Sequence, residues 1–259
     1  MEADDKRRSL LNRLQKTLSD AIMLIVEEQE HHALCYRAIS MMQPYAQILP
    51  QFYGNHVKDF TEEQKASLAR WLEYMMITLQ SANNEQARDY QRVKRRTVII
   101  LADVIEAVVK IVTATCLQDF AETSNQLREL TGYKKPICVG SDAKNAVRKW
   151  EQRLYPILPS RVDRFEYMLV YFFPDFVRPP NFKLLDTLIE RRNQLTHDVI
   201  PLSENIQNDP EIPTFTAQQI DDFFVASGDF VLAMLNAVST KITGEIASLD
   251  PRYESSIQI

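Results

Sequence analysis

The chain of 259 residues contains only five glycines. The tight turns of β-hairpins and the phosphate-binding loops of nucleotide-binding α/β folds both depend on glycine. The sequence also lacks the GxGxxG and GxxxxGK[ST] patterns of such loops. Apolar residues instead recur at the three- and four-residue spacing of helices that bury one face, as in Leu10, Leu14, Leu18, Ile22 and Ile25. We therefore predict an all-α fold.

The first half of the chain, residues 1–132, is predicted to be a long-helix N-terminal region of unknown role. A first helix is expected over residues 6–42, because three residues that interrupt helices follow it: Pro44, Pro50 and Gly54. A Thr-x-x-Gln capping box at residues 61–64 predicts the start of a second helix. A third, long helix is expected over residues 85–130, with Gly132 as its C-terminal stop.

A domain boundary is predicted at residues 132–141, which hold two of the five glycines and a proline. Four helical patterns follow it, separated by prolines or a polar loop: residues 141–155, 160–173, 181–200 and 216–242. Ser141 and a second capping box, at residues 216–219, are expected to begin two of these helices. Consecutive helices with short connections are typical of an antiparallel four-helix bundle, which we predict for residues 141–259.

The charge balance limits the classes of partner and compartment. Lys and Arg number 30 against 35 Asp and Glu, which excludes a generally basic surface for nucleic acid but not a local basic patch. An odd number of widely spaced cysteines favours reduced thiols over a disulfide framework: Cys35, Cys116 and Cys138. The N-terminus lacks an apolar signal segment, and the most apolar run, residues 98–117, carries charges on one helical face: Asp103, Glu106 and Lys110. We expect a cytoplasmic protein without a membrane span.

The helix expected over residues 181–200 carries one charged residue on the stripe that its spacing marks for burial: Leu185, Leu188, Arg192, Leu195 and Val199. A buried guanidinium is costly unless it is paired or hydrogen-bonded, so Arg192 must have a compensating partner. The adjoining stripe is polar: Asp186, Glu190, Asn193 and His197. In a structural interpretation, Arg192 pairs with Glu190 or a neighbouring acid, and a positive His197 suits the C-terminal end of the helix dipole.

The segment Arg192-Asn193-Gln194-Leu195-Thr196-His197 resembles the R-N-x-x-x-H signature of HEPN domains, which are four-helix bundles found in many prokaryotic toxins and defence ribonucleases. The resemblance covers roughly residues 141–259 and does not extend to the first 130 residues. One departure is Asp198, where many members of the family have glycine. The resemblance implies a ribonuclease whose catalytic residues lie on the third helix of the bundle.

The residue types also suit RNA cleavage without a metal or other cofactor. Histidine exchanges a proton near neutral pH, so His197 is expected to act as the acid and base that serve the ribose 2′-OH and the leaving 5′-oxygen. Arginine offers a permanently charged, planar set of donors, so Arg192 is expected to hold the phosphate. Asn193 is expected to orient the imidazole or to donate to the phosphate.

Arg192 and His197 are five positions apart, which places them about 140° from each other around a regular α-helix. They can converge on one phosphate if the helix ends or loosens before His197, or if a second copy of the chain supplies the other partner. We expect a homodimer with both His197 side chains in one groove, and the family resemblance implies that arrangement too. An RNA substrate is the expected ligand, and an antitoxin or another defence-system protein is a further candidate partner.

Three other patterns occur in the sequence. A basic stripe is interpreted as a solvated helix face or as a contact for RNA phosphates: Arg88, Arg92, Lys94, Arg95 and Arg96. His31 and Cys35 have the i, i+4 spacing of two metal ligands, but no second pair matches them. An aromatic cluster is expected in the bundle core or a dimer interface: Tyr167, Tyr171, Phe172, Phe173 and Phe176.

The leading hypothesis is a metal-independent endoribonuclease of the HEPN type that acts as a toxin or antiviral defence effector. The alternative is a non-catalytic HEPN-like helical module that binds RNA, a nucleotide or a partner protein. A purely structural helical scaffold is the third interpretation, since the long helix expected over residues 85–130 is typical of one. Incubation with RNA in EDTA separates the first hypothesis from the other two.

Overall fold

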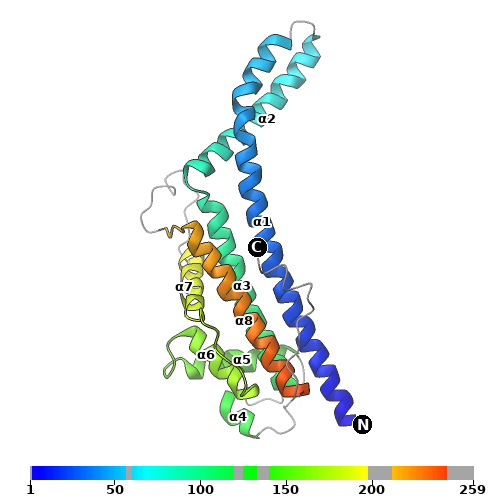
Figure 1. The fold of residues 1–259 in the computed structure, drawn as a ribbon, viewed down its shortest axis with the longest axis vertical. Helices are drawn as coiled ribbons and strands as arrows, with labels where there is room; N and C mark the ends of the chain where they lie inside the picture. Colours follow the sequence, from blue (N-terminus) through cyan, green and yellow to red (C-terminus); the bar gives the residue numbers. More distant parts are fainter. Residues whose placement is uncertain (1, 57–59, 120–124, 133–139, 198–211, 244–259) are drawn as a thin grey trace. The chain divides into compact units, whose positions relative to one another are not determined.

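A computed structural model of the chain describes residues 2–56, 60–119, 125–132, 140–197 and 212–243, and for some residues within these ranges, His197 among them, only the backbone. In the described ranges the regular secondary structure consists of helices and contains no strand, so the predicted all-α fold is confirmed (Figure 1). The helices are α1 (Glu2–His56), α2 (Glu62–Ala87), α3 (Gln91–Asp119), α4 (Asn125–Thr131), α5 (Gly140–Leu154), α6 (Arg161–Phe172), α7 (Leu184–His197) and α8 (Ala217–Thr243).

The prediction that the first helix ends near Met42 is wrong. Helix α1 continues through Pro44, Pro50 and Gly54 and ends at His56. A proline inside a helix lacks one N–H donor and crowds the preceding turn, which is a local cost. The helix can resume on the far side of such a residue, so these three positions did not mark its end.

The prediction of one long helix over residues 85–130 is also wrong, because the chain leaves the helical path between α2 and α3. Asp89 and Tyr90 have φ angles of +52° and +57°, in the left-handed region that a right-handed helix cannot contain. The carboxylate of Glu85 accepts a 2.6 Å hydrogen bond from the backbone N–H of Arg92, which caps the free first turn of α3. Helix α3 then ends at Asp119, and α4 is a separate short helix.

Several predicted helix boundaries are confirmed. Thr61 caps α2 with both hydrogen bonds of a capping box, and Thr216 and Gln219 make the same reciprocal pair at the start of α8, at 2.9 and 3.1 Å. Ser160 caps α6 by accepting a hydrogen bond from the N–H of Asp163. Helix α5 begins at Gly140, one residue before Ser141, so Ser141 lies within the helix instead of preceding it.

Gly132 ends α4 as predicted, with a φ of +66°. A Cβ atom at this position would lie 3.0 Å from the Arg153 guanidinium, so Gly132→Ala combines backbone strain with a close contact. We expect this variant to lose about 1 kcal/mol of unfolding free energy or more in urea titration. Gly228→Ala is the matched control, because it lies inside α8 with no atom within 4 Å of the added methyl group. This control should gain about 0.5–1 kcal/mol, and a loss from Gly228→Ala or no loss from Gly132→Ala would contradict the account.

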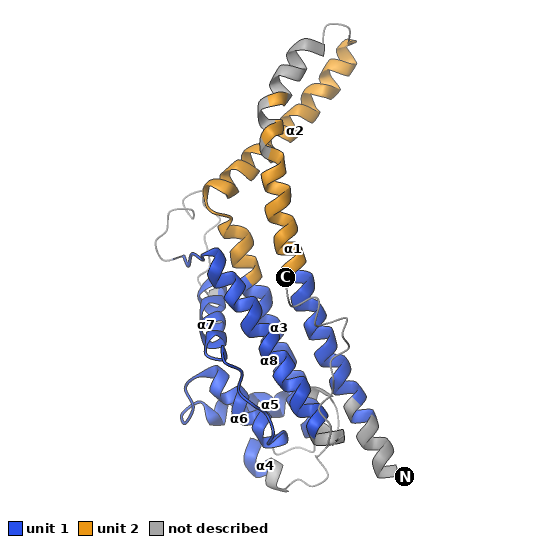
Figure 2. Ribbon diagram, viewed as in Figure 1, with its two compact units in different colours: residues 1–28, 98–259 blue, residues 29–97 orange. Residues whose placement is uncertain are grey.

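The chain divides into two compact units (Figure 2). The first comprises residues 1–28 and 98–259, and the second comprises residues 29–97. This division differs from the boundary predicted at residues 132–141, because the start of α1 and most of α3 belong to the same unit as α5 to α8. Four helices do occupy the stretches predicted for the bundle, at α5, α6, α7 and α8.

One apolar core holds the first unit together. It draws on α1, α3 and α5 to α8, and α7 contacts both α6 and α8. The Phe members of the predicted aromatic cluster are in this core, where Trp150 packs edge-on against Phe172. Tyr167 and Tyr171 also contact Trp150 by their rings but keep exposed surface. This packing fixes α7, which carries the predicted catalytic residues, against the rest of the unit.

The second unit consists of the rest of α1, helix α2 and the start of α3. The side chain of Lys94 is fully buried and pairs with Asp89 at 2.5 Å. The rings of Tyr36 and Tyr90 stack with centroids 4.0 Å apart, and the Tyr90 hydroxyl lies 3.0 Å from that of Ser40. These contacts join the left-handed turn at residues 89–90 to α1 and to the start of α3.

Helix α8 contains the one stretch among the described helices, Ala217–Thr240, that is long and apolar enough to cross a membrane. Within this fold 61% of the residues in its most apolar window are buried. The central helix of a helical core has the same length and composition, so the stretch alone is weak evidence for a membrane.

Candidate functional site

The stripe predicted for burial on α7 is present as far as Leu195, and Arg192 lies on it, while Val199, its last predicted member, lies outside the described residues. Leu185, Leu188 and Leu195 are buried, while Arg192 is half-buried. Its guanidinium donates to the carboxylate of Glu106 on α3, and its Nε lies 3.5 Å from Oδ1 of Asp103 on the same helix. The compensating partners of Arg192 are therefore Glu106 and Asp103. The structural interpretation predicted a pairing with Glu190 or a neighbouring acid, and the acids that pair with Arg192 lie on α3.

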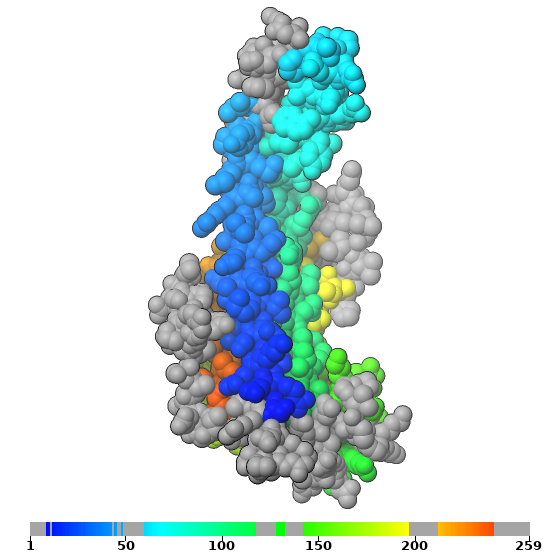
Figure 3. Space-filling model, turned by 90° about the vertical axis from the view of Figure 1, so that its right-hand side faces the viewer, coloured from blue at the N-terminus to red at the C-terminus, as the bar shows by residue number. Residues whose placement is uncertain are grey.

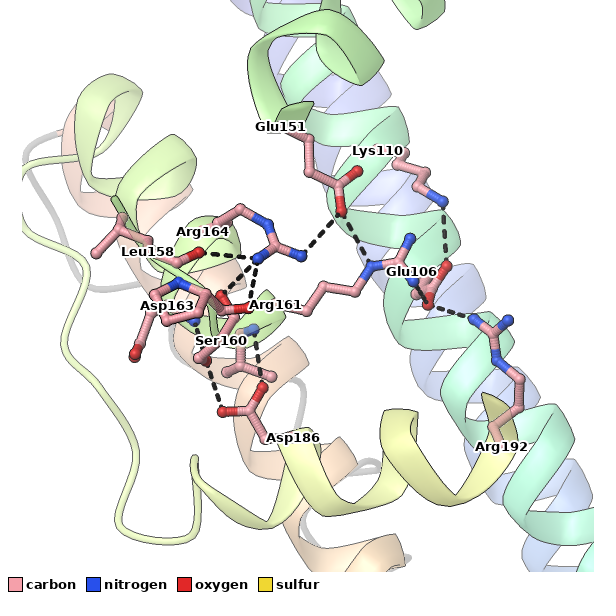
Figure 4. A network of polar contacts seen from close by, with 12 residues as sticks. Glu106, Lys110, Glu151, Leu158, Ser160, Arg161, Asp163, Arg164, Asp186 and Arg192 are labelled. Carbon is pink, nitrogen blue, oxygen red and sulfur yellow. Dashed lines mark hydrogen bonds and ion pairs between the residues drawn. The ribbon is translucent and has the colours of Figure 1, made fainter. Parts of the chain in front are cut away.

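Glu106 is the centre of a cluster of charges (Figure 4). One of its carboxylate oxygens contacts Arg192 and, at 2.8 Å, Arg161 at the start of α6. The other oxygen contacts Lys110 at 3.1 Å. Only 8% of the Glu106 side chain is exposed, so these three cations take the place of water around the carboxylate.

The polar network extends from Glu106 toward the start of α6. Arg161 also pairs with Glu151 at 3.0 Å, and Arg164 lies 3.8 Å from the same carboxylate. Burial lowers the pKa of Arg164, and the negative charge of Glu151 opposes this effect. Arg164 also donates to the backbone carbonyls that precede α6: Leu158 at 2.8 Å, Pro159 at 2.7 Å and Ser160 at 3.2 Å. The network thus fixes the start of α6 beside α3.

Asp186 on α7 has a structural role in the same region. Its carboxylate accepts hydrogen bonds from the hydroxyl of Ser160 at 2.6 Å and from the N–H of Val162 at 3.1 Å (Figure 4). A carboxylate at the first turn of a helix satisfies free N–H groups and interacts favourably with the helix dipole. Asp186 therefore joins α7 to α6, and the polar stripe on which it lies is not wholly free for chemistry.

Cations and carboxylates balance in this cluster. Four cations take part, Arg161, Arg164, Arg192 and Lys110, with four carboxylates, Glu106, Glu151, Asp103 and Asp186. Arginine and lysine are the side chains that bind phosphate groups in proteins, and two arginines here converge on one point. The arrangement is chemically suited to hold an anion beside α7, provided that the anion competes with Glu106.

The other two predicted site residues are placed only in part. Asn193 is half-buried next to Arg192, and its backbone carbonyl lies 3.3 Å from the Thr196 hydroxyl, which donates to it. His197 is the last residue of α7, and its side chain lies outside the described residues. Because α7 is continuous to His197, the helix does not end before this residue, and Arg192 and His197 remain about 140° apart around its axis. Of the two arrangements considered for their convergence, a helix that ends early is therefore not observed.

Sequence reasoning missed Glu106, the main partner of Arg192. Its signal was present, because Asp103, Glu106 and Lys110 form a charged face on an otherwise apolar stretch. A buried arginine on one helix and an acid on an apolar helix elsewhere in the chain are candidates for pairing. The separation of 86 residues between Glu106 and Arg192 left no local pattern that could join them.

The basic stripe predicted at the start of α3 is not a single solvated face. Lys94 is fully buried against Asp89, and Nε of Arg92 lies 3.9 Å from the Glu85 carboxylate. Arg96 lies beside the imidazole of His31. Intramolecular contacts thus engage Arg92, Lys94 and Arg96, and Arg95 interacts electrostatically with Glu85.

His31 and Cys35 do meet in space, with the Cys35 Sγ 3.6 Å from both imidazole nitrogens. Among the described residues, however, no three His, Cys, Asp or Glu side chains are grouped so that they could hold a metal ion. A protein metal site needs at least three such ligands. Among the described residues, the pair therefore has no third ligand of these types with which to form a metal site.

A shallow apolar groove of about 440 Å³ lies between α1 and α3 in the first unit, where the two helices run side by side (Figure 3). It is lined mainly by alanine, valine, leucine and isoleucine, with polar atoms from Thr17, Asp20 and Asp103. Asp103 thus faces the groove and also approaches Arg192. The sequence did not predict this groove, since its two walls are some 80 positions apart in the chain.

The chain was compared with protein-family models, curated protein sequences and solved structures. No family model, no curated protein and no solved structure matches it.

Proposed function

We propose that the chain is a metal-independent endoribonuclease of the HEPN type that acts in the cytoplasm as a toxin or antiviral defence effector. The observation that carries the proposal is the position of Arg192, which lies with Arg161 and Lys110 around one carboxylate on α3. Cations that converge on a carboxylate oxygen are placed to bind a phosphate oxygen, because both anions accept the same charge-assisted hydrogen bonds.

In the proposed reaction, a phosphodiester of RNA takes over the guanidinium donors of Arg192 from Glu106. Arg192 then stabilises the negative charge that grows on the phosphate as the ribose 2′-OH attacks it. His197 accepts the proton of this hydroxyl and returns a proton to the leaving 5′-oxygen. Asn193, one residue from Arg192, orients the imidazole or donates to the phosphate.

A homodimer completes this site. Because α7 is continuous to His197, positions 192 and 197 lie about 140° apart around the axis of one copy of the helix. Two copies of α7 that face each other across a two-fold axis bring the arginine of one chain toward the histidine of its partner. Light scattering of an active sample should give the mass of a dimer, and a monomer mass for an active sample would contradict this assembly.

A second candidate is a non-catalytic HEPN-like module that binds RNA, a nucleotide or a protein. The pairing of Arg192 with Glu106 and Asp103 favours it, because an arginine with two acidic partners already has a structural role. The two candidates differ in what the loss of the Arg192 guanidinium does to RNA cleavage and to stability.

Arg192→Ala tests the proposal, with Arg191→Ala as its matched control. Arg191 is the adjacent arginine, is exposed, and bonds Gln194 of its own helix at 2.9 Å. We expect Arg192→Ala to slow RNA cleavage by about 10²–10³-fold, the usual cost of losing one donor to transition-state charge. Arg192→Lys keeps the charge beside Glu106 but loses the planar donors, so it should remain folded and still cleave poorly.

Circular dichroism and urea titration of the same variants show whether each is folded, so that a loss of RNA cleavage can be told from a loss of stability. Equal cleavage by Arg192→Ala and Arg191→Ala would contradict the catalytic role of Arg192. A natural chain that binds RNA without cleaving it would favour the non-catalytic module.

A further inference from the structure

The apolar groove between α1 and α3 lies wholly within the first unit and shares only Asp103 with the charge cluster around Glu106. Its volume is about 440 Å³, and the two helices run side by side along it (Figure 3). Ala21 and Val108 are buried in it, whereas Leu24 and Ile111 are 49% and 41% exposed. Large aliphatic side chains thus remain half exposed beside small buried ones, and the described part of the chain does not cover them. A contiguous exposed surface of this kind is typical of an interaction site.

The spacing of the lining residues fits a helical occupant. They are four and three positions apart on both helices: Ile100, Val104, Ala107 and Ile111 on α3, and Thr17, Ala21 and Leu24 on α1. This spacing places each set on one face of its helix. The α3 set spans roughly 16 Å at about 1.5 Å per residue, which is about three turns of an α-helix. The side chains of a third helix can therefore pack between the two rows.

The charged residues that line the groove are both acidic, one on each wall. Asp20 on α1 is exposed and forms no ion pair with another residue that the structure describes. Asp103 on α3 lies 3.5 Å from Nε of Arg192 but keeps 61% of its side chain exposed, so it can accept a second cation. Both walls therefore attract lysine or arginine and repel a carboxylate or a phosphate.

The same charges argue against a second copy of the chain as the occupant of the groove. In a two-fold interface the same surface of each copy meets itself, so the acids of one copy would approach the same acids of the other. Like charges placed against each other oppose association. The proposed homodimer is formed through α7, so it does not require this groove.

We propose that the groove is the docking site for an amphipathic helix of another protein, a helix with one apolar face flanked by lysine or arginine. Its apolar residues, at positions i, i+3 or i+4 and i+7, pack on Ala21 and Val108 and between Leu24 and Ile111. The basic residues beside this face pair with the carboxylates on the two walls. This inference goes beyond the proposed RNA cleavage and does not depend on it.

Binding of a fluorescein-labelled synthetic peptide to the full chain tests the proposal. The peptide has about 18 residues, with leucine at alternating three- and four-residue spacing and lysine elsewhere, and is only marginally helical when free. Fluorescence anisotropy should show that it binds about tenfold more tightly, or more, than two control peptides. One control has glutamate in place of lysine, and the other has the same composition with the leucine spacing scrambled. Equal affinity of the three peptides would overturn the proposal.

Circular dichroism of the complex tests whether the occupant is a helix. The spectrum of the mixture, after subtraction of that of the chain alone, should show that the leucine-lysine peptide gains helicity when it binds. Binding without a gain in helicity would overturn the assignment of the groove to a helix.

Leu24→Lys and Met23→Lys locate the bound peptide. The two residues are adjacent on α1 and are 49% and 41% exposed, but only Leu24 lines the groove. Both variants add the same positive charge, so they differ in position alone. Leu24→Lys should weaken binding of the leucine-lysine peptide by about tenfold or more, and Met23→Lys by less than about twofold. Equal weakening, or none, would place the peptide outside the groove and overturn the proposal.

Asp20→Asn provides a second test that does not disturb the apolar lining, because the Asp20 side chain is exposed. It should weaken binding of the leucine-lysine peptide by about threefold or more at low salt, and an unchanged affinity would overturn the pairing with Asp20. Light scattering of Leu24→Lys should give the same mass as the natural chain. A lower mass would show that a second copy occupies the groove and would overturn its assignment to another protein.

Discussion

The variant His197→Ala is expected to cleave RNA about 10²–10⁴-fold more slowly than the natural chain, the usual contribution of a general acid or base. In the proposed reaction no other group on α7 can both accept and return a proton near neutral pH. His197 is the last residue of this helix, so its replacement should leave the apolar stripe of α7 in place. Cleavage of a labelled RNA under single-turnover conditions measures the effect.

Thr196→Ala is the control for this variant. Thr196 is exposed, and its hydroxyl donates to the carbonyl of Arg192 at 3.0 Å in its own helix. A hydroxyl that bonds back to its own helix contributes little to stability. Comparable losses in Thr196→Ala and His197→Ala would show that the end of α7, and not the imidazole, is what cleavage requires.

The variant Glu106→Ala is expected to lower the free energy of unfolding by about 3 kcal/mol, because it leaves partly buried guanidinium groups without their carboxylate. The side chains of Arg161 and Arg192 are only 26% and 15% exposed, so water cannot fully replace the lost partner. Urea titration followed by circular dichroism measures the change.

Asp103→Ala gives the comparison on the same helix. The Asp103 side chain is 61% exposed and makes only a 3.5 Å contact with Arg192, so its loss should cost less than about 1 kcal/mol. If both variants lose the same small amount, Glu106 is not the centre of the charge cluster. If Glu106→Ala instead raises the free energy of unfolding, the cost of burying the Glu106 carboxylate exceeds the repulsion among the three cations that it separates.

Local patterns predicted much of the fold. The apolar stripe of α7 and the capping boxes at residues 61–64 and 216–219 each depend on residues within one or two helical turns. The stop at Gly132 likewise depends on one residue that tolerates a positive φ. Such features follow from helix geometry alone, and the structure has them where the sequence predicted them.

The features that sequence reasoning missed depend on distant contacts. The break between α2 and α3 is formed by Asp89 and Tyr90, both with positive φ. Aspartate tolerates such a φ but tyrosine seldom adopts it, and residues 85–92 contain no glycine or proline that would signal the break. It is held by Glu85 and by the buried Lys94, whose roles appear only in three dimensions. The partner of Arg192 was missed for the same reason, because α3 and α7 meet only in the folded chain.

Incubation of the purified full chain with RNA in EDTA tests the central claim most directly, with the fragment ends read by mass spectrometry. Because the ribose 2′-OH is the nucleophile in the proposed reaction, the chain should cleave RNA without metal. The fragments should then carry 2′,3′-cyclic phosphate and 5′-hydroxyl ends. An absence of cleavage in EDTA, or fragments with 5′-phosphate ends, would contradict the account, since the latter arise from a metal-activated water.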